Sequence, residues 1–302
     1  MRVVIALGGN AILKRGEPMT AENQRSNVKR AAKAIAEVIA AGHEVVVTHG
    51  NGPQIGLMAL QDMAFDPALA SPIDVLGAET AGMLGYLLAQ ELGNALPKTM
   101  EIVALLTQIV VDPDDPAFQK PSKPIGPVYG EVEAAVLTKK LGWVMVPDGA
   151  HFRRAVPSPR PNRILEIEVI RLLVNHGVTV ICAGGGGIPV VRRNDGSHTG
   201  IEAVIDKDHA SGFLAREIQA DALLLLTDVD GVYLDWGTAQ KRRMTSVTPN
   251  ELKAHSFASG SMGPKVAAAI DFAASGRGMT GIGRLEDALD ILEQRAGTVV
   301  KL

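Results

Sequence analysis

Three lysines lie in loops beside glycine or proline, where a cation can reach a bound anion. Lys207 follows Ile205-Asp206, Lys265 follows Ser261-Met262-Gly263-Pro264, and Lys123 falls in a proline-rich segment. A cation is disfavoured at a helix N-terminus, and a phosphate bound beside Lys207 would remove that objection. Each lysine alone can be a solvated surface group. Together they indicate charge neutralisation of a phosphoryl group during its transfer.

Three glycine-rich turns each follow a continuous apolar run. The turns are Gly8-Gly9-Asn10, His49-Gly50-Asn51-Gly52 and Gly184-Gly185-Gly186-Gly187. Apolar runs of this kind are typical of strands buried on both faces of a parallel sheet. Ligands of open α/β sheets bind outside the carboxyl ends of the strands, where glycine lets backbone N–H groups approach an anion. The three turns therefore predict a site for several anionic groups, such as a triphosphate and an acidic acceptor. A tight turn alone would explain any one of them.

Carboxylates and a hydroxyl follow two further apolar runs. Asp206 and Asp208 flank Lys207 at an expected helix start, where helix capping is the alternative explanation. Thr227-Asp228 ends a run of four leucines and is either a ligand contact or only a polar turn. These polar groups are expected at the same edge of the sheet as the glycine turns, where a charged ligand would bind.

Strand and helix patterns alternate through most of the chain. The apolar runs predict strands at 3–7, 44–48, 102–111, 178–183 and 222–227, and near Thr298. The periodicity predicts helices at about 21–41, 78–92, 164–175 and 208–219, and after Pro53 and Pro264. Such alternation favours a parallel sheet with helical crossovers.

The alternation breaks in a proline-rich segment. Prolines stand at 113, 116, 121, 124 and 127, and those at 157, 159 and 161 close the region. Such a run is too long and too rigid for an ordinary connection. We therefore expect about 112–162 to form a small subdomain or lid on the main sheet, with an inert surface excursion as the alternative.

The composition limits the partners and the location. The 302 residues are 46% apolar, enough for one large α/β domain or two smaller ones. A net charge of −3 and an aromatic fraction of 4% argue against nucleic acid and anionic membranes as partners. Cys182 is the one cysteine, which excludes an intrachain disulfide. With no signal peptide and no apolar run long enough to span a membrane, the expected location is the cytoplasm.

Other enzyme signatures do not occur in the sequence. The seven histidines form no HExxH motif, and none joins a cysteine cluster, so no protein ligands for a metal are expected. The chain also lacks the GxxxxGK[ST] loop, a GxSxG elbow and a dinucleotide-binding GxGxxG turn. A phosphoryl-transfer site would therefore be of a different type from the P-loop.

Several long motifs follow one another from the first expected strand to Lys265. They are 6–11 (ALGGNA), 16–20 (GEPMT) with 23–25 (NQR), 48–54 (THGNGPQ), 74–80 (DVLGAET), 123–127 (KPIGP), 156–159 (VPSP), 184–189 (GGGGIP), 205–208 (IDKD) and 261–265 (SMGPK). In these motifs the chain closely resembles the carbamate kinases, a family with the amino-acid kinase fold.

The resemblance implies an α/β fold, a three-layer αβα sandwich around a mostly parallel eight-stranded sheet with a small protruding subdomain. It implies an amino-acid kinase domain over 1–302, with an acceptor half at about 1–177 and a nucleotide half at about 178–302. It also implies a homodimer and reversible in-line phosphoryl transfer between ATP and carbamate, giving ADP and carbamoyl phosphate without a covalent enzyme intermediate. Mg²⁺ would be bound through the nucleotide phosphates.

The resemblance also implies roles for individual residues. Those expected to bind carbamate and the transferred group are Gly8, Gly9, Asn10, Gly50, Asn51 and Gly52. Those expected to bind the nucleotide are Lys207, Thr227, Asp228, Tyr233, Met262, Gly263, Pro264 and Lys265. Lys207 and Lys265 would neutralise phosphate charge, and Asp208 would orient both. Lys123 would reach in from the subdomain.

One sequence position distinguishes kinases of this fold that act on different acceptor substrates. Relatives that act on other carboxylates usually carry a lysine two residues before the first glycine pair, where this chain has Ala6. In carbamate kinases the subdomain lysine supplies that charge, so Ala6 together with Lys123 favours carbamate over N-acetylglutamate or aspartate. Two alternatives stay open: a sibling kinase for another small acceptor, and a non-catalytic nucleotide-binding regulator. The reaction could run in either direction at the same site. One direction produces ATP in arginine breakdown, and the other supplies carbamoyl phosphate for biosynthesis.

Overall fold

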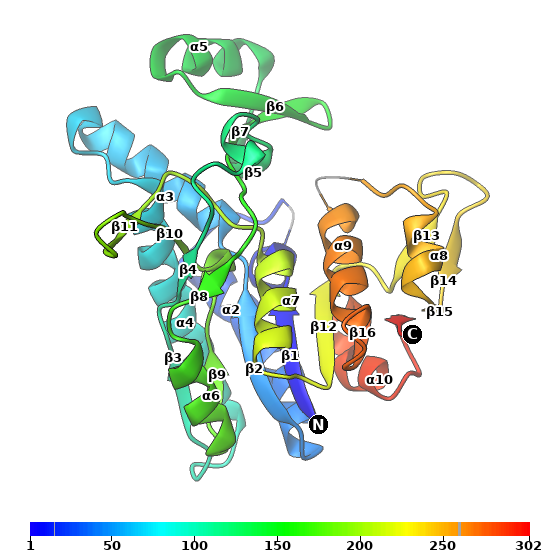
Figure 1. Cartoon of the computed structure of the whole chain (residues 1–302). Helices are drawn as coiled ribbons and strands as arrows, with labels where there is room; N and C mark the ends of the chain where they lie inside the picture. The colour runs from blue at the N-terminus through cyan, green and yellow to red at the C-terminus, as the bar shows by residue number, and fades with distance from the viewer. Residues whose placement is uncertain (15, 259–260) are drawn as a thin grey trace.

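Eight strands form one central sheet in the order β15-β17-β16-β12-β1-β2-β9-β3 (Figure 1). The computed structural model describes residues 1–14, 16–258 and 261–302. The strands are β1 (Arg2–Leu7), β2 (Glu44–His49), β3 (Ile102–Ala104), β9 (Thr179–Ile181), β12 (Ala222–Thr227), β15 (Ser246–Val247), β16 (Met279–Arg284) and β17 (Thr298–Val300). Every neighbouring pair is parallel except β16 with β17. The predicted mostly parallel eight-stranded sheet is confirmed.

Helices cover both faces of this sheet and complete the predicted three layers. Successive side chains of a strand point to opposite faces, so in β1 Val4 and Ala6 pack on one side, while Val3 and Ile5 pack on the other. The first side is covered by α6 (Ile167–Asn175), α7 (Lys207–Glu217) and α9 (Met262–Ala273). The second is covered by α2 (Ala21–Ala40), α4 (Ile73–Ala95) and α10 (Ala288–Leu292). All of β1 from Val3 to Leu7 is fully buried, as its apolar run predicts.

The remaining elements lie around the rim of the sheet. A three-stranded sheet of β5 (Lys123–Tyr129), β7 (His151–Val156) and β6 (Val144–Asp148) carries α5 (Glu131–Leu141), and together they stand out at the top of Figure 1. We call residues 123–156 the subdomain. The others are α1 (Gly9–Ile12), α3 (Gly52–Phe65), α8 (Pro249–Lys253), β4 (Gln108–Val110), β8 (Arg163–Ile164), β10 (Ile188–Arg192), β11 (His198–Gly200), β13 (Val232–Leu234), β14 (Arg242–Met244) and the 3-10 turns η1 (Pro67–Leu69), η2 (Pro116–Phe118), η3 (Gly184–Gly186) and η4 (Leu285–Asp287). No helix of the described residues is long and apolar enough to span a membrane.

Several predicted elements differ in detail. The run 102–111 is two strands, because the chain leaves the main sheet after Ala104 and β4 then pairs with β8 and β10. The helix predicted at 78–92 is longer and begins at Ile73, after Pro72. The helix predicted at 164–175 begins at Ile167, because the two residues of β8 precede it. The strand β16 was not predicted, since two glycines interrupt its apolar pattern.

Candidate active site

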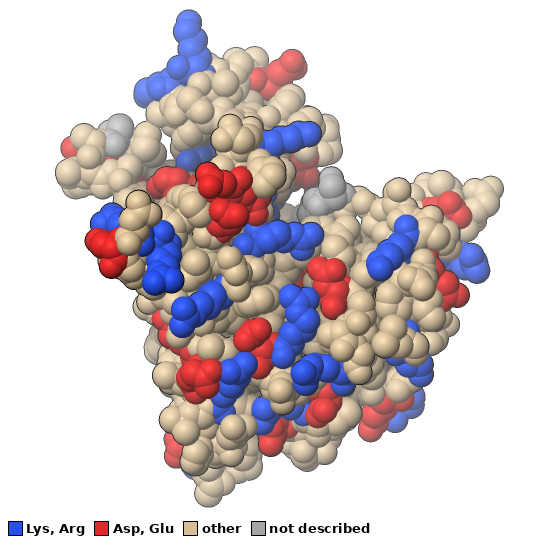
Figure 2. Space-filling model, viewed as in Figure 1, with Lys and Arg blue, Asp and Glu red and all other residues tan. Residues whose placement is uncertain are grey.

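The carboxyl ends of β1, β2 and β12 open onto a cleft of about 1050 Å³. Figure 2 shows the surface hollowed between the subdomain and the part that contains β13, β14 and α8. The predicted residues that line the cleft are Gly8, Gly9, Gly50, Asn51, Gly52, Lys123, Lys207, Asp208, Thr227, Asp228, Tyr233, Met262, Pro264 and Lys265. The fold therefore brings together residues from well-separated parts of the sequence.

Two of the glycine turns lie side by side in the cleft. β1 and β2 are parallel neighbours with Leu7 paired to His49, so both turns leave the same edge of the sheet. The backbone of Asn10 lies in α1, but its side chain is outside the described part of the structure. The side-chain amide of Asn51 donates to Thr80 Oγ1 at 2.8 Å and is buried against α4. This hydrogen bond fixes the orientation of the Asn51 side chain, which lines the cleft beside the backbone of the two turns.

The third glycine run has a different place. Of this run, Gly185 lines the cleft. Gly186 has a φ of +95°, and a Cβ there would lie 2.1 Å from the carbonyl oxygen of Ile205. A side chain cannot be accommodated at such a distance, so this run packs beneath the segment that enters α7. The run thus packs directly against the backbone that leads to Lys207 and Asp208.

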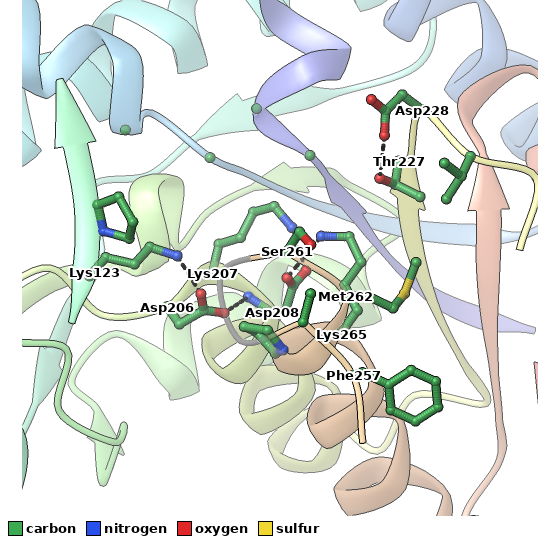
Figure 3. Close-up of a pocket in the computed structure, with 18 of the residues that line it drawn as sticks. Lys123, Asp206, Lys207, Asp208, Thr227, Asp228, Phe257, Ser261, Met262 and Lys265 are labelled. Carbon is green, nitrogen blue, oxygen red and sulfur yellow. Dashed lines mark hydrogen bonds and ion pairs between the residues drawn. The ribbon is translucent and has the colours of Figure 1, made fainter. Parts of the chain in front are cut away.

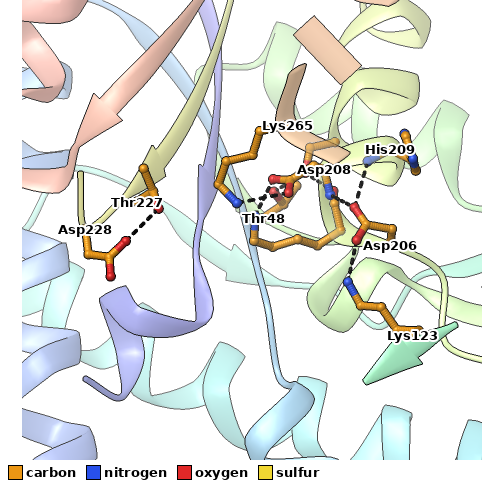
Figure 4. Close-up of polar contacts among 10 residues, drawn as sticks. Thr48, Lys123, Asp206, Asp208, His209, Thr227, Asp228 and Lys265 are labelled. Carbon is orange, nitrogen blue, oxygen red and sulfur yellow. Dashed lines mark hydrogen bonds and ion pairs between the residues drawn. The ribbon is translucent and has the colours of Figure 1, made fainter. Parts of the chain in front are cut away.

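Two lysines converge on one buried carboxylate. Asp208 accepts hydrogen bonds from Lys207 Nζ (Figure 3) and, at 3.1 Å, from Lys265 Nζ (Figure 4). Lys207 and Asp208 stand in the first turn of α7, and Lys265 in the first turn of α9. All three side chains are at most 11% exposed. Burial would raise the pKa of Asp208, but the two ammonium groups outweigh it and hold the pKa below its ordinary value.

The charge of Lys207 depends on this arrangement. Burial lowers the pKa of Lys207 to about 8, and Asp208 opposes that shift. The ammonium group is therefore mostly charged at neutral pH although it is buried. A site with two lysines and one carboxylate keeps an excess of positive charge, which suits a phosphate ligand.

Lys123 enters the cleft from the subdomain. It is the first residue of β5, and its Nζ donates to Asp206 Oδ2 (Figure 3). The structure thus places the third predicted lysine at the N-cap of α7, next to the turn that carries Lys207 and Asp208. Asp206 is the N-cap of α7, and its Oδ1 accepts from Asp208 N at 2.8 Å.

The other side of the cleft is formed by residues after β12 and before α9. Thr227 Oγ1 donates to Asp228 Oδ1 at 3.1 Å. The ring of Tyr233 packs edge-to-face on Trp236, with centroids 5.2 Å apart. Gly263 is the one predicted nucleotide residue that does not line the cleft, and a Cβ there would lie 3.0 Å from the carbonyl oxygen of Ala258.

Sequence reasoning missed several residues of the cleft. Asp206 was expected as a carboxylate at a helix start but was given no role in the site. The cleft is also lined by residues that were not singled out: Arg153, Trp236, Ser256 and Phe257. Arg153 Nε donates to the carbonyl oxygen of Gly126 at 3.0 Å, so it also stiffens the subdomain. The acidic pair around Lys207 was the only local signal for Asp206.

A buried histidine supports the second glycine turn. His49 ends β2, and its Nδ1 lies 3.3 Å from the carbonyl oxygen of Gly50. Burial lowers its pKa from 6.5 to about 4, and the Gly50 carbonyl only partly opposes this. The ring is therefore neutral at pH 7.

We expect His49 to make the protein less stable in acid. Its pKa is lower in the folded state, so the unfolded chain binds the proton first, and stability present above about pH 6.5 is lost as the pH falls towards 4. The loss reaches about 3 kcal/mol at about 1.4 kcal/mol per pKa unit. Urea unfolding from pH 7 to 4 should show a shallower decline for His49→Asn than for wild type. The exposed His151→Asn variant should follow wild type, and parallel curves for His49→Asn and wild type would contradict the assignment.

Comparison with known proteins agrees with the fold. The family described as "Amino acid kinase family" matches residues 1–280, and the chain belongs to this family. It is 53% identical to a carbamate kinase from Rhizobium meliloti (strain 1021), over 99% of this chain and 93% of that protein. The carbamate kinase from Giardia lamblia bound to citric acid has a TM-score of 0.93 at 40% identity, covering 99% of this chain and 98% of that one. The same Giardia lamblia enzyme, thiocarbamoylated by disulfiram on one of its cysteines, has a TM-score of 0.87 at 40% identity, with the same coverage.

Proposed function

We propose that this chain is a carbamate kinase, which transfers a phosphoryl group reversibly between ATP and carbamate. The observation that carries the proposal is the pair of buried lysines on Asp208, beside two glycine turns at the carboxyl edge of a parallel sheet. Phosphoryl transfer needs little covalent chemistry from the protein, but two anions must be aligned and their charge stabilised. Relatives that match the chain over nearly its whole length carry the same name.

The two ends of the cleft suit the two substrates. Carbamate and the transferred group would lie against the backbone of the first two glycine turns, and ATP between Thr227 and the start of α9. Lys207 and Lys265 would stabilise charge on the transferred group, while Asp208 keeps their ammonium groups together. The carbamate oxygen attacks phosphorus in line, ADP leaves, and no enzyme nucleophile is required.

The acceptor end lacks a cation from the main sheet. Ala6 is fully buried in β1, two residues before the first glycine pair. We propose that Lys123 supplies the charge at this end and that the subdomain acts as a lid. A sibling kinase for a larger carboxylate would need a cation at the Ala6 position, so carbamate is the acceptor that this arrangement favours.

Mg²⁺ would enter with the nucleotide. The main carboxylates around the lysines are engaged, Asp208 by Lys207 and Lys265 and Asp206 by Lys123. The described residues contain no group of three or more histidine, cysteine or acidic side chains placed to hold a metal. Phosphate oxygens would therefore be its principal ligands, and its charge would add to that of the lysines.

We also propose that the chain forms a homodimer through α4. Val75, Met83 and Tyr86 of this helix are exposed, and exposed apolar side chains on one element are typical of an interface. Sedimentation of the purified protein tests this, with Tyr86→Glu as the variant that should weaken the dimer.

Turnover in both directions tests the proposed function. Purified protein should form ATP from ADP and carbamoyl phosphate, and ADP from ATP and carbamate. N-acetylglutamate and aspartate serve as competing acceptors, and preference for either would favour the sibling-kinase alternative. Binding of ADP without turnover would instead favour a regulator.

We expect the enzyme to resist disulfiram, because its one thiol is inaccessible. Cys182 follows β9, is 1% exposed, and has its pKa raised to about 12 by burial. A thiol in this state is a poor nucleophile, so activity should stay within about twofold of the untreated value. Mass spectrometry should detect modification of Cys182 only after denaturation. Inactivation that parallels modification in the folded enzyme would contradict the expectation.

A further inference from the structure

The chain at both ends of the subdomain contacts the segment that leads into α7 and the first turn of that helix. On the entering side, Lys123 pairs with Asp206. On the leaving side, Arg160 Nη1 donates to His209 Nδ1 at 2.6 Å, and Val204 N donates to the carbonyl oxygen of Pro157 at 2.9 Å. The start of the helix that carries Lys207 and Asp208 is therefore also one of the places where the subdomain is held.

Asp206 joins these two structures through one carboxylate. Oδ1 caps α7, accepting from Asp208 N at 2.8 Å and from His209 N at 3.4 Å. Oδ2 accepts from Lys123 Nζ. The Asp206 side chain is 8% exposed, whereas that of Lys123 is 28% exposed. An ion pair that is partly shielded from water holds its geometry better than an exposed one.

We propose that Asp206 is a positioning residue that fixes Lys123 at the phosphate-facing end of α7. This inference rests on the proposed function. The cap fixes where the carboxylate stands relative to Asp208, two residues on, and the carboxylate in turn fixes the ammonium group of Lys123. Within the docked subdomain, the Asp206 side chain thus determines how close the subdomain cation lies to the two buried lysines.

The backbone of the subdomain supports the same position. Gly126 of β5 packs so closely on Gly56 of α3 that a Cβ on Gly56 would lie 1.7 Å from Gly126 Cα. Lys123 stands three residues before this contact on the same strand. The contact between Gly126 and Gly56 brings β5 to the cleft. The hydrogen bond to Asp206 then fixes the position of Lys123 Nζ.

Electrostatics keeps the pairing intact at working pH. Burial alone would raise the pKa of Asp206, but Lys123 and then Lys207 lower it well below the ordinary value. Asp206 is therefore ionised wherever the enzyme is folded and near neutral pH.

The test separates capping from positioning. Asparagine caps a helix as well as aspartate does, so Asp206→Asn keeps the cap and removes the charge that holds Lys123. We expect kcat to fall about tenfold to a hundredfold, the size of effect produced by misplacing a group by about 1 Å, with the KM for ADP within about twofold. In the Lys123→Ala background, Asp206→Asn should cause almost no further loss.

Control variants keep the result decisive. Asp66→Asn also replaces a local capping aspartate, whose Oδ1 accepts from Ala68 N at 2.9 Å, but it lies outside the cleft and should leave kcat unchanged. If the Asp206→Asn variant does not fold, the Asp206→Ser variant takes its place in the test, because serine also offers an oxygen that caps the helix. An equal loss from Asp206→Asn with and without Lys123, or no loss at all, would overturn the proposal.

A second measurement does not depend on the reaction. Hydrogen exchange of the β5 amides should become faster in both Asp206→Asn and Lys123→Ala, and not in Asp66→Asn. If the wild-type enzyme forms no carbamoyl phosphate, the proposed function fails while this measurement still tests the tie between Asp206 and Lys123. Unchanged exchange in both variants would overturn the positioning role.

Discussion

Replacing Lys207 or Lys265 with alanine should reduce turnover by roughly two to three orders of magnitude. Both ammonium groups are buried and already held in place by Asp208, so they stabilise developing charge without further reorganisation. Removing one preorganised group of this kind costs about 3–4 kcal/mol of transition-state stabilisation. A coupled assay of ATP formation measures the effect directly.

The folded state of these variants needs its own check. Each substitution leaves Asp208 with one lysine partner instead of two, so thermal unfolding should be recorded beside the assay. Lys253→Ala, in the last turn of α8 and outside the cleft, is the matched control for loss of one lysine. Near-wild-type turnover in folded Lys207→Ala and Lys265→Ala proteins would show that the site is assigned wrongly.

Lys123→Ala should weaken catalysis strongly and leave the affinity for ADP nearly unchanged. A lysine that acts at the transferred group contributes more to the transition state than to nucleotide binding. Closure of the subdomain over the cleft would also exclude water and limit hydrolysis of ATP. Calorimetric titration with ADP, run beside the coupled assay, separates the two effects.

The outcome distinguishes three places for Lys123. A large loss of turnover at constant ADP affinity fits the lid. A large loss of ADP affinity would move Lys123 to the nucleotide end, and an unchanged turnover number would make the subdomain an inert excursion. Lys139→Ala, in the last turn of α5, is the control within the same subdomain.

The central strands were predictable because they are buried on both faces. Such strands leave continuous apolar runs in the sequence, as in β1, β2 and β12. The glycine turns follow these runs, so their common edge could also be inferred. By contrast, β16 contains Gly281 and Gly283, which remove the strand pattern although the strand is largely buried. The split of 102–111 depends on pairing with β10, which no local pattern encodes.

Contacts between residues that are far apart in the sequence could not be predicted from it. Lys123 and Asp206 stand 83 positions apart, and periodicity says nothing about such a pair. Trp236 reaches the cleft from the connection between β13 and β14, which pair with each other outside the main sheet. The residue types of the site could be read from motifs, whereas their mutual distances required the fold.

The place of β1 in the sheet has a consequence for synthesis on the ribosome. One edge of β1 pairs with β2, which ends at His49, but the other edge pairs with β12, which ends at Thr227. At about 5–20 residues per second, translation leaves that second edge unpaired for roughly 10–40 seconds. An apolar strand with an open edge is prone to pair with other chains. We therefore expect the nascent chain to be most prone to association with other chains before β12 emerges.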